Sequence, residues 1–466
     1  MVLLILKYII INTEKIPLIT KIYVWSLLFE PFIYFVKAGG GQESGIPISV
    51  SKILQILVIL LFIQQIFSNK LNLNFNKKSL SINFFIYLLI IVLSTFFAFT
   101  IFNSYNINFK TSNLVETSGD TPLLKSQFIR PFFDFINLIY YYFYFILLFT
   151  KLITNKLFLN YFFKYFILTF KLALGLGFLD LLFVYFSGEA LLKRHFDQDT
   201  DVGFRFHSFL GEPRDAFVFL IYSILLLYLI NEKFYRIKYF NSIISISIFS
   251  LILTQSASGL IGIFVGSILI LIYYLIKLNK YSLYLFCSII ILLILAVILI
   301  PQSPRIMIYI ESFSELFDYL KSGGELPYYI LVQSVNVLPI WGLYNHLFDN
   351  LYRVFFGSGI SASAYYNMNY IGDIGYSNPN SQFTRIIYDS GIIGFLFNLK
   401  FLITTPLKIT KQLLTTKKMN KIITIFLIFS SSALIHRSLL PLIIVGLFTT
   451  LPFIYNLNIK LNEKLN

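Results

Sequence analysis

The chain has 466 residues, of which 57% are hydrophobic and 13% are charged, and its formal net charge is +15. So little charge excludes a soluble globular protein of this length, and a single cysteine, Cys287, excludes an intramolecular disulfide and a cysteine-based metal cluster. A basic chain often binds nucleic acid, but here the lysines lie mostly between apolar blocks, where they set membrane orientation. No nucleic-acid partner is therefore expected.

Apolar blocks of about 20 residues recur along the chain, which is the length that a helix needs to cross about 30 Å of hydrocarbon. Backbone groups in lipid must bond internally, so these blocks should be helices. We predict an all-α polytopic membrane protein with about 12 transmembrane helices. The predicted spans are 17–37, 49–68, 82–102, 131–150, 162–186, 214–230, 240–254, 257–276, 282–300, 385–404, 422–436 and 438–456.

Alternate connections between these spans are rich in lysine, and the positive-inside rule assigns them and both termini to the cytoplasm. The long connections are then external. This predicts an N-terminal transmembrane bundle of about nine helices over 1–300, a large external loop over 301–384 and C-terminal transmembrane helices over 385–466. Apolar residues three or four apart in this loop predict an amphipathic helix on the membrane surface, and they are Ile306, Ile310, Phe313 and Phe317.

The arginines are distributed against the positive-inside rule, because only Arg236 falls on the predicted cytoplasmic side. The others lie in external loops or at outer helix ends, and they are Arg130, Arg194, Arg205, Arg214, Arg305, Arg353, Arg385 and Arg437. A guanidinium binds phosphate through two parallel hydrogen bonds and keeps its charge. The distribution predicts an external anionic ligand near the membrane. Pairing with nearby acids or with lipid headgroups is the alternative.

Residues 203–216, GFRFHSFLGEPRDA, concentrate polar chemistry at the start of a predicted span. Pro213 suits the first turn of a helix, whose free N–H groups would form an anion site beside Arg205 and Arg214. His207 or Glu212 could act as a general base. A loop histidine bonded to the backbone is the plainer alternative for His207.

Residues 357–394 close the external loop and enter the next span with a high content of glycine and asparagine, which is typical of tight backbone beside a site. Asn378 and Asn380 can bond sugar hydroxyls, and tyrosines of this segment, Tyr388 among them, offer faces to sugar rings. Arg385 and Asp389 are four residues apart, so we expect them to pair on one helix face.

Metal sites are not predicted. The three aspartates Asp197, Asp199 and Asp201 lack the glycine and the glutamate of a calcium loop, and no two histidines have zinc spacing. Lys171 and Asp180 lie nine residues apart on one predicted helix, about 13 Å along its axis, so each needs another partner.

Two patterns make the chain resemble the superfamily of O-antigen polymerases and O-antigen ligases. The first is R-x-x-S-x-x-x-E-P, which here begins at Arg205 and ends at Pro213; the second runs from G-S-G at 357–359 through Asn378 and Asn380 to D-S-G-I-I-G at 389–394. TQSASG at 254–259 is similar to a third segment of that family. Ligases often carry a histidine where this chain has Pro379, which favours a polymerase of the Wzy type.

The resemblance implies a metal-independent, cofactor-free glycosyltransferase of the bacterial plasma membrane, with its active site facing the exterior. Glycans linked to undecaprenyl diphosphate would be its substrates, membrane lipids its surroundings, and a flippase and a chain-length regulator its partners. Arginines would hold the leaving diphosphate, and His207 or Glu212 would accept the proton of the attacking hydroxyl. The expected diphosphate ligands are Arg205, Arg214 and Arg385, with substrate binding also by Arg305, Arg353, Asn378, Asn380, Tyr388 and Arg437.

Three alternatives remain open from the sequence. A ligase would transfer finished glycan to lipid A core. A flippase or other transporter would show internal repeats, of which the sequence has none that convince. A transferase of single sugars would carry an acidic pair in its first external loop, where this chain has only Glu43.

Overall fold

The computed structural model describes residues 17–29, 50–68, 82–101, 129–148, 156–188, 191–192, 205–210, 213–233, 236–256, 259, 262–263, 265–268, 343–344, 346–363 and 382–401. Within these ranges the regular structure is helical and contains no strand, which confirms the predicted all-α class. Residues 269–342 lie outside them. The predicted amphipathic helix, the twelve spans as a set and the domain boundaries at 300 and 384 therefore stay predictions.

Eight of the predicted apolar blocks coincide with helices, and most of the shared boundaries agree to within a few residues. The principal helices are α2 (Leu18–Phe29), α3 (Val50–Phe67), α4 (Ile82–Thr100), α6 (Ile129–Tyr142), α8 (Lys156–Ser187), α9 (Pro213–Lys233), α10 (Phe240–Leu253) and α18 (Gln382–Leu399). Shorter elements are the π-helix η3 (Phe143–Leu148), the 3-10 turn η4 (Ser208–Leu210) and α16 (Leu351–Phe356).

Two of these helices are long and apolar enough to cross a membrane, over Ile82–Thr100 in α4 and Asn160–Ser187 in α8. Helix α4 buries one side against α18. Its other side leaves large apolar side chains exposed, which lipid would cover at no cost. These side chains are Phe85, Leu89, Val92, Leu93 and Phe96.

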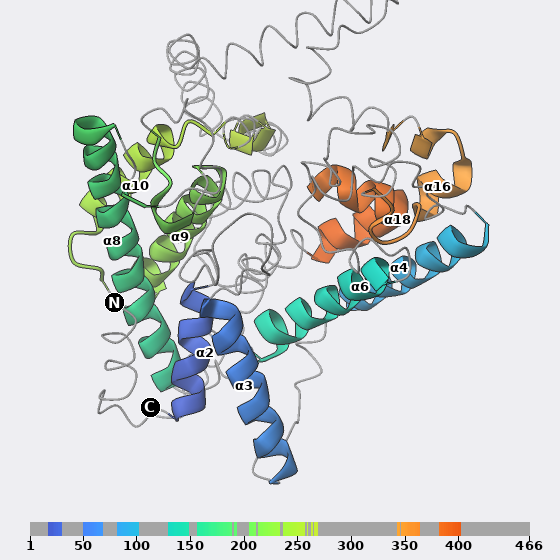
Figure 1. Cartoon of the computed structure of the whole chain (residues 1–466), viewed down its shortest axis with the longest axis horizontal. Helices are drawn as coiled ribbons and strands as arrows, with labels where there is room; N and C mark the ends of the chain where they lie inside the picture. Colours follow the sequence, from blue (N-terminus) through green and yellow to red (C-terminus); the bar gives the residue numbers. More distant parts are fainter. Residues whose placement is uncertain are drawn as a thin grey trace, which may run out of the picture.

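The helices form two groups that Figure 1 draws at opposite sides of the molecule. One group contains α8, α9 and α10, with η4 packed against α8 and α9. The other contains α4, α16 and α18, which pack against one another. Helix α2 packs against both α3 and α8.

Helix ends follow from local chemistry. Helix α8 stops at Gly188, which has φ +74°, a left-handed conformation that glycine adopts without steric cost. Helix α9 begins at Pro213, as the sequence predicts. The side chain of Asn350 caps α16 by accepting a hydrogen bond from the Tyr352 N–H at 2.9 Å. These ends fix where the polar loops leave the helical groups.

Candidate functional site

Helix α18 is broken at Gly391, whose φ of 68° and ψ of −177° are not helical. A side chain here would overlap the main-chain carbonyl of Phe355, so the backbone conformation and the close approach both require glycine. The break lies inside the D-S-G-I-I-G pattern and leaves main-chain carbonyls of the preceding turn without helical partners.

The freed carbonyls are bonded by a loop from elsewhere in the chain. Residues 357–363, here called the clasp, lie against the break, where Ser358 N–H donates to Tyr388 O at 2.8 Å and Gly359 N–H donates to Asp389 O at 3.0 Å. Gly357 has φ +82°, and a Cβ on it would overlap the backbone at Ser390. The G-S-G and D-S-G patterns are therefore in direct contact.

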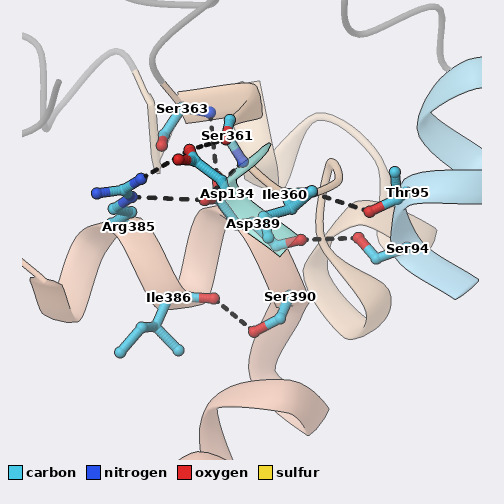
Figure 2. A network of polar contacts seen from close by, with 10 residues as sticks. All are labelled: Ser94, Thr95, Asp134, Ile360, Ser361, Ser363, Arg385, Ile386, Asp389 and Ser390. Carbon is cyan, nitrogen blue, oxygen red and sulfur yellow. Dashed lines mark hydrogen bonds and ion pairs between the residues drawn. The ribbon is translucent and has the colours of Figure 1, made fainter. Parts of the chain in front are cut away.

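The Asp389 carboxylate ties the far end of the clasp to α18 (Figure 2). Its oxygens accept hydrogen bonds from the Ser361 N–H at 3.0 Å and the Ser363 N–H at 3.1 Å. Arg385 Nε lies 3.9 Å from the same carboxylate, which confirms the predicted pair one helical turn apart. Because the two main-chain N–H groups are much closer, the carboxylate mainly holds the loop.

Arg385 has a second and closer acidic partner in Asp134 of α6. Arg385 Nη2 lies 3.2 Å from Asp134 Oδ2, and the same oxygen accepts a hydrogen bond from the Ser361 hydroxyl. The side chains of Arg385 and Asp134 are 18% and 25% exposed, respectively, so a ligand can reach the ion pair although most of its surface is buried. Sequence reasoning missed Asp134, because it lies within a stretch predicted as an apolar span.

Helix α4 supports the same arrangement from the opposite side (Figure 2). The Ser94 hydroxyl donates to Asp389 O at 2.7 Å, and the Ile360 N–H of the clasp donates to Thr95 Oγ1 at 3.2 Å. Ser94 and Thr95 are thus polar residues on an otherwise apolar helix for a structural reason, since they bond main-chain groups that have no helical partner.

A histidine that the sequence analysis did not single out joins this cluster. His346 Nδ1 lies 2.6 Å from the Tyr388 hydroxyl, and Arg353 Nη1 donates to His346 O at 3.5 Å. Burial, reinforced by the positive charge of Arg353 and opposed by Asp349, lowers the pKa of His346 from 6.5 to about 4. The imidazole is therefore neutral at pH 7.

These residues form what we call the α18 site, which consists of Asp134, His346, Arg353, Ser361, Arg385, Tyr388 and Asp389. Arg353, Arg385 and Tyr388 were predicted from the sequence as site residues, and Asp389 was predicted as the partner of Arg385. Two chain segments about 250 residues apart supply Asp134 and Arg385, so only the fold could reveal that they meet.

Arg205 belongs to a different set of contacts. Its guanidinium donates to Thr254 O at 3.2 Å and to Gln255 O at 3.1 Å, and the neighbouring Phe206 N–H donates to Leu253 O at 2.8 Å. The pattern that begins at Arg205 is therefore joined to the TQSASG segment at the end of α10. These main-chain carbonyls orient the guanidinium.

His207 is fully buried beside Arg205. Its Nδ1 lies 2.8 Å from Ser208 O, and its Nε2 lies 3.0 Å from Asp180 Oδ2 in α8. A carbonyl only accepts, so Nδ1 carries the hydrogen of this contact. Asp180 thereby has the partner that the sequence required. We call Asp180, Arg205, His207, Thr254 and Gln255 the α10 site.

The arginines predicted to bind one diphosphate thus divide between two sites. Arg385 and Arg353 lie in the α18 site and Arg205 in the α10 site, and Figure 1 draws α10 and α18 far apart. Arg214 is in the first turn of α9, and its side chain is not described. Predictions that fall outside the described residues concern Glu212, Arg305, Asn378, Asn380 and Arg437.

Comparison with known protein families, curated proteins and solved structures finds no match for this chain. In the part of the chain that the structure describes, no group of three or more histidine, cysteine, aspartate or glutamate side chains could hold a metal ion.

Proposed function

We propose that this chain is a polysaccharide polymerase of the bacterial plasma membrane, which joins oligosaccharide repeat units carried on undecaprenyl diphosphate at the outer face. Its reaction is a metal-independent glycosyl transfer with inversion, and lipid diphosphate is the leaving group. We assign the reacting centre to the α18 site.

One observation carries this assignment: Arg353, Arg385 and Tyr388, which the sequence predicts as ligands of a lipid-linked glycan, lie in two sets of contacts that the clasp joins at Tyr388 and Asp389. Arg385 is held by two carboxylates from two helices and is still 18% exposed. A cation fixed in this way needs no reorganisation when negative charge develops on a departing diphosphate, and such fixed charge is the main source of catalysis for this kind of step.

The α10 site is less suited to the same reacting group. Arg205 bonds main-chain carbonyls at the end of α10, whereas Arg385 contacts acids of α6 and α18, and Figure 1 draws α10 and α18 at opposite sides of the molecule. The histidine beside Arg205 is fully buried between Ser208 and Asp180, where an acceptor sugar has no access to it. We therefore assign to the α10 site the task of joining α8, η4 and α10.

In the proposed reaction the acceptor is the terminal sugar of a second lipid-linked repeat unit. Its hydroxyl oxygen attacks the anomeric carbon of the donor, and the bond from that carbon to the diphosphate oxygen breaks. The electron pair leaves with the diphosphate. Arg385 and Arg353 neutralise that charge. The Tyr388 hydroxyl holds the His346 ring, and the main-chain carbonyl of His346 orients the Arg353 guanidinium.

The test uses a host strain from which the gene is deleted, complemented with single variants. Arg385→Ala should abolish long glycan chains and leave single repeat units, with the protein present in the membrane at the wild-type level. Arg236→Ala is the matched control, because Arg236 is an exposed arginine on the predicted cytoplasmic side. It should give the wild-type chain-length pattern on a gel. Long chains at the wild-type level in the Arg385→Ala strain would refute the assignment.

The deletion strain itself separates the other activities. Loss of a polymerase leaves single repeats on the acceptor lipid, whereas loss of a ligase leaves none. A transporter is separated by the purified protein in lipid nanodiscs, where both faces are open and no transport is needed. There a polymerase makes oligomers from lipid-linked repeat units, and a transporter makes none.

A further inference from the structure

The proposed transfer leaves one proton without a destination. The acceptor hydroxyl must lose its proton as its oxygen bonds to the anomeric carbon, and a positioned side chain near that oxygen speeds such a step by about 10²–10⁴-fold. The base must be anchored, and it must also keep a lone pair that reaches the substrate.

Asp134 has this arrangement. Both of its contacts, the Ser361 hydroxyl and Arg385 Nη2, involve Oδ2. No hydrogen bond or ion pair from the described residues involves Oδ1. One oxygen is thus fixed by two donors while the other is left for a proton, and 25% of the side chain is exposed.

The other carboxylates whose side chains the structure describes do not combine these properties. Asp389 is 7% exposed, and each of its oxygens already accepts from a main-chain N–H. Asp180 is 1% exposed and lies against His207, and Asp215 is buried as well. Asp349 is exposed on the surface.

We propose that Asp134 is the general base of the transfer, which rests on the function proposed above. Asp134 Oδ1 takes the proton of the acceptor hydroxyl, the hydroxyl oxygen forms its bond to the anomeric carbon, and the lipid diphosphate leaves with the electron pair of the broken bond. Arg385 then has two roles in the step, since it orients the base through Oδ2 and, in the proposed function, neutralises the leaving charge.

The experiment measures polymerisation of purified lipid-linked repeat units by the full chain in lipid nanodiscs. In Asp134→Asn the amide oxygen can still accept from Ser361 and Arg385, so the site keeps its shape while the basic oxygen is lost. We expect the rate to fall by about 10²–10⁴-fold, with unchanged binding of the lipid-linked donor. Arg236→Ala, at the exposed arginine on the predicted cytoplasmic side, is the control and should keep the wild-type rate.

The pH profile is the readout that a purely structural role would not change. The wild-type rate should fall at acid pH as the base is protonated, and the residual rate of Asp134→Asn should lack that fall. An Asp134→Asn rate within about tenfold of wild type, or a residual rate with the wild-type acid limb, overturns the proposal.

Two further results distinguish failure of the proposed function from failure of the Asp134 assignment. A wild-type protein that makes no polymer refutes the proposed function itself, whatever Asp134 does. If Asp134→Asn does not fold, as judged by its elution in detergent, Asp134→Glu replaces it: measurable activity that falls at acid pH supports the base, and a folded but inactive Asp134→Glu overturns it.

Discussion

The break in α18 can be tested by placing a methyl group where the backbone excludes one. Gly391→Ala puts a Cβ against the Phe355 carbonyl and forces a non-glycine residue into φ 68°. Comparison with two other glycines separates the steric overlap from the strain of a positive φ. Gly188 has φ +74° but open space around it, and Gly175 has open space in the middle of α8.

The magnitude follows from the contacts at the break. A residue held in this backbone region costs about 1–3 kcal/mol, and opening the clasp instead would lose four hydrogen bonds worth about 1 kcal/mol each. We expect Gly391→Ala to destabilise the protein by about 3–4 kcal/mol. Gly188→Ala should cost about 1–2 kcal/mol from conformation alone, and Gly175→Ala should cost nothing, because alanine favours the helix.

The assay is the thermal unfolding midpoint of the purified protein in detergent. At an unfolding entropy of about 2 cal/mol/K per residue, a chain of 466 residues loses about 1 °C for each kcal/mol. The expected order of midpoints is Gly175→Ala at or above wild type, then Gly188→Ala, then Gly391→Ala about 3–4 °C below wild type. If Gly391→Ala unfolds at the same temperature as Gly188→Ala, steric exclusion at the break contributes nothing and the reasoning is wrong.

Two further predictions concern the histidines His346 and His207. Folding lowers the pKa of His346 to about 4, so the unfolded chain takes up this proton first and stability is lost as pH falls from 6.5 toward 4. Discounted for the partial exposure of His346, the loss of folding free energy is about 1–2 kcal/mol. His346→Gln should therefore reduce the fall of the unfolding midpoint between pH 7 and pH 4.5 by about 1–2 °C. A fall equal to that of the wild type would contradict this prediction. Asp180→Leu leaves His207 without its acidic partner and should destabilise by about 3–5 kcal/mol. Adding His207→Phe should recover part of this loss, and additive losses in the double variant would show that the two side chains do not interact.

Helix positions were accessible from the sequence because apolar length alone determines them. The predicted 49–68, 82–102 and 240–254 are helices over Val50–Phe67, Ile82–Thr100 and Phe240–Leu253. The Arg385 and Asp389 pair was also predicted correctly, because four residues on a helix fix the distance between two side chains. These are local relations, which the order of residues contains directly.

The pairing of distant segments could not be predicted in the same way. Asp134 lies in an apolar helix and has no neighbour in the sequence that indicates its partner Arg385. The sequence around Gly391 predicts an uninterrupted helix, and only the contact with the clasp reveals the break. Arg205 and Arg385 share a side of the predicted membrane topology, but topology fixes depth and leaves position within the plane undetermined, so the sequence does not place the two guanidinium groups relative to each other.

The break in α18 has a consequence for how this region forms. The main-chain carbonyls of Tyr388 and Asp389 accept hydrogen bonds from the clasp N–H groups of Ser358 and Gly359, and the Ser94 hydroxyl also donates to the Asp389 carbonyl. The bent helix and the loop are accordingly one cooperative unit. Deleting residues 357–363 would remove these main-chain donors from the break, and we then expect α18 to straighten.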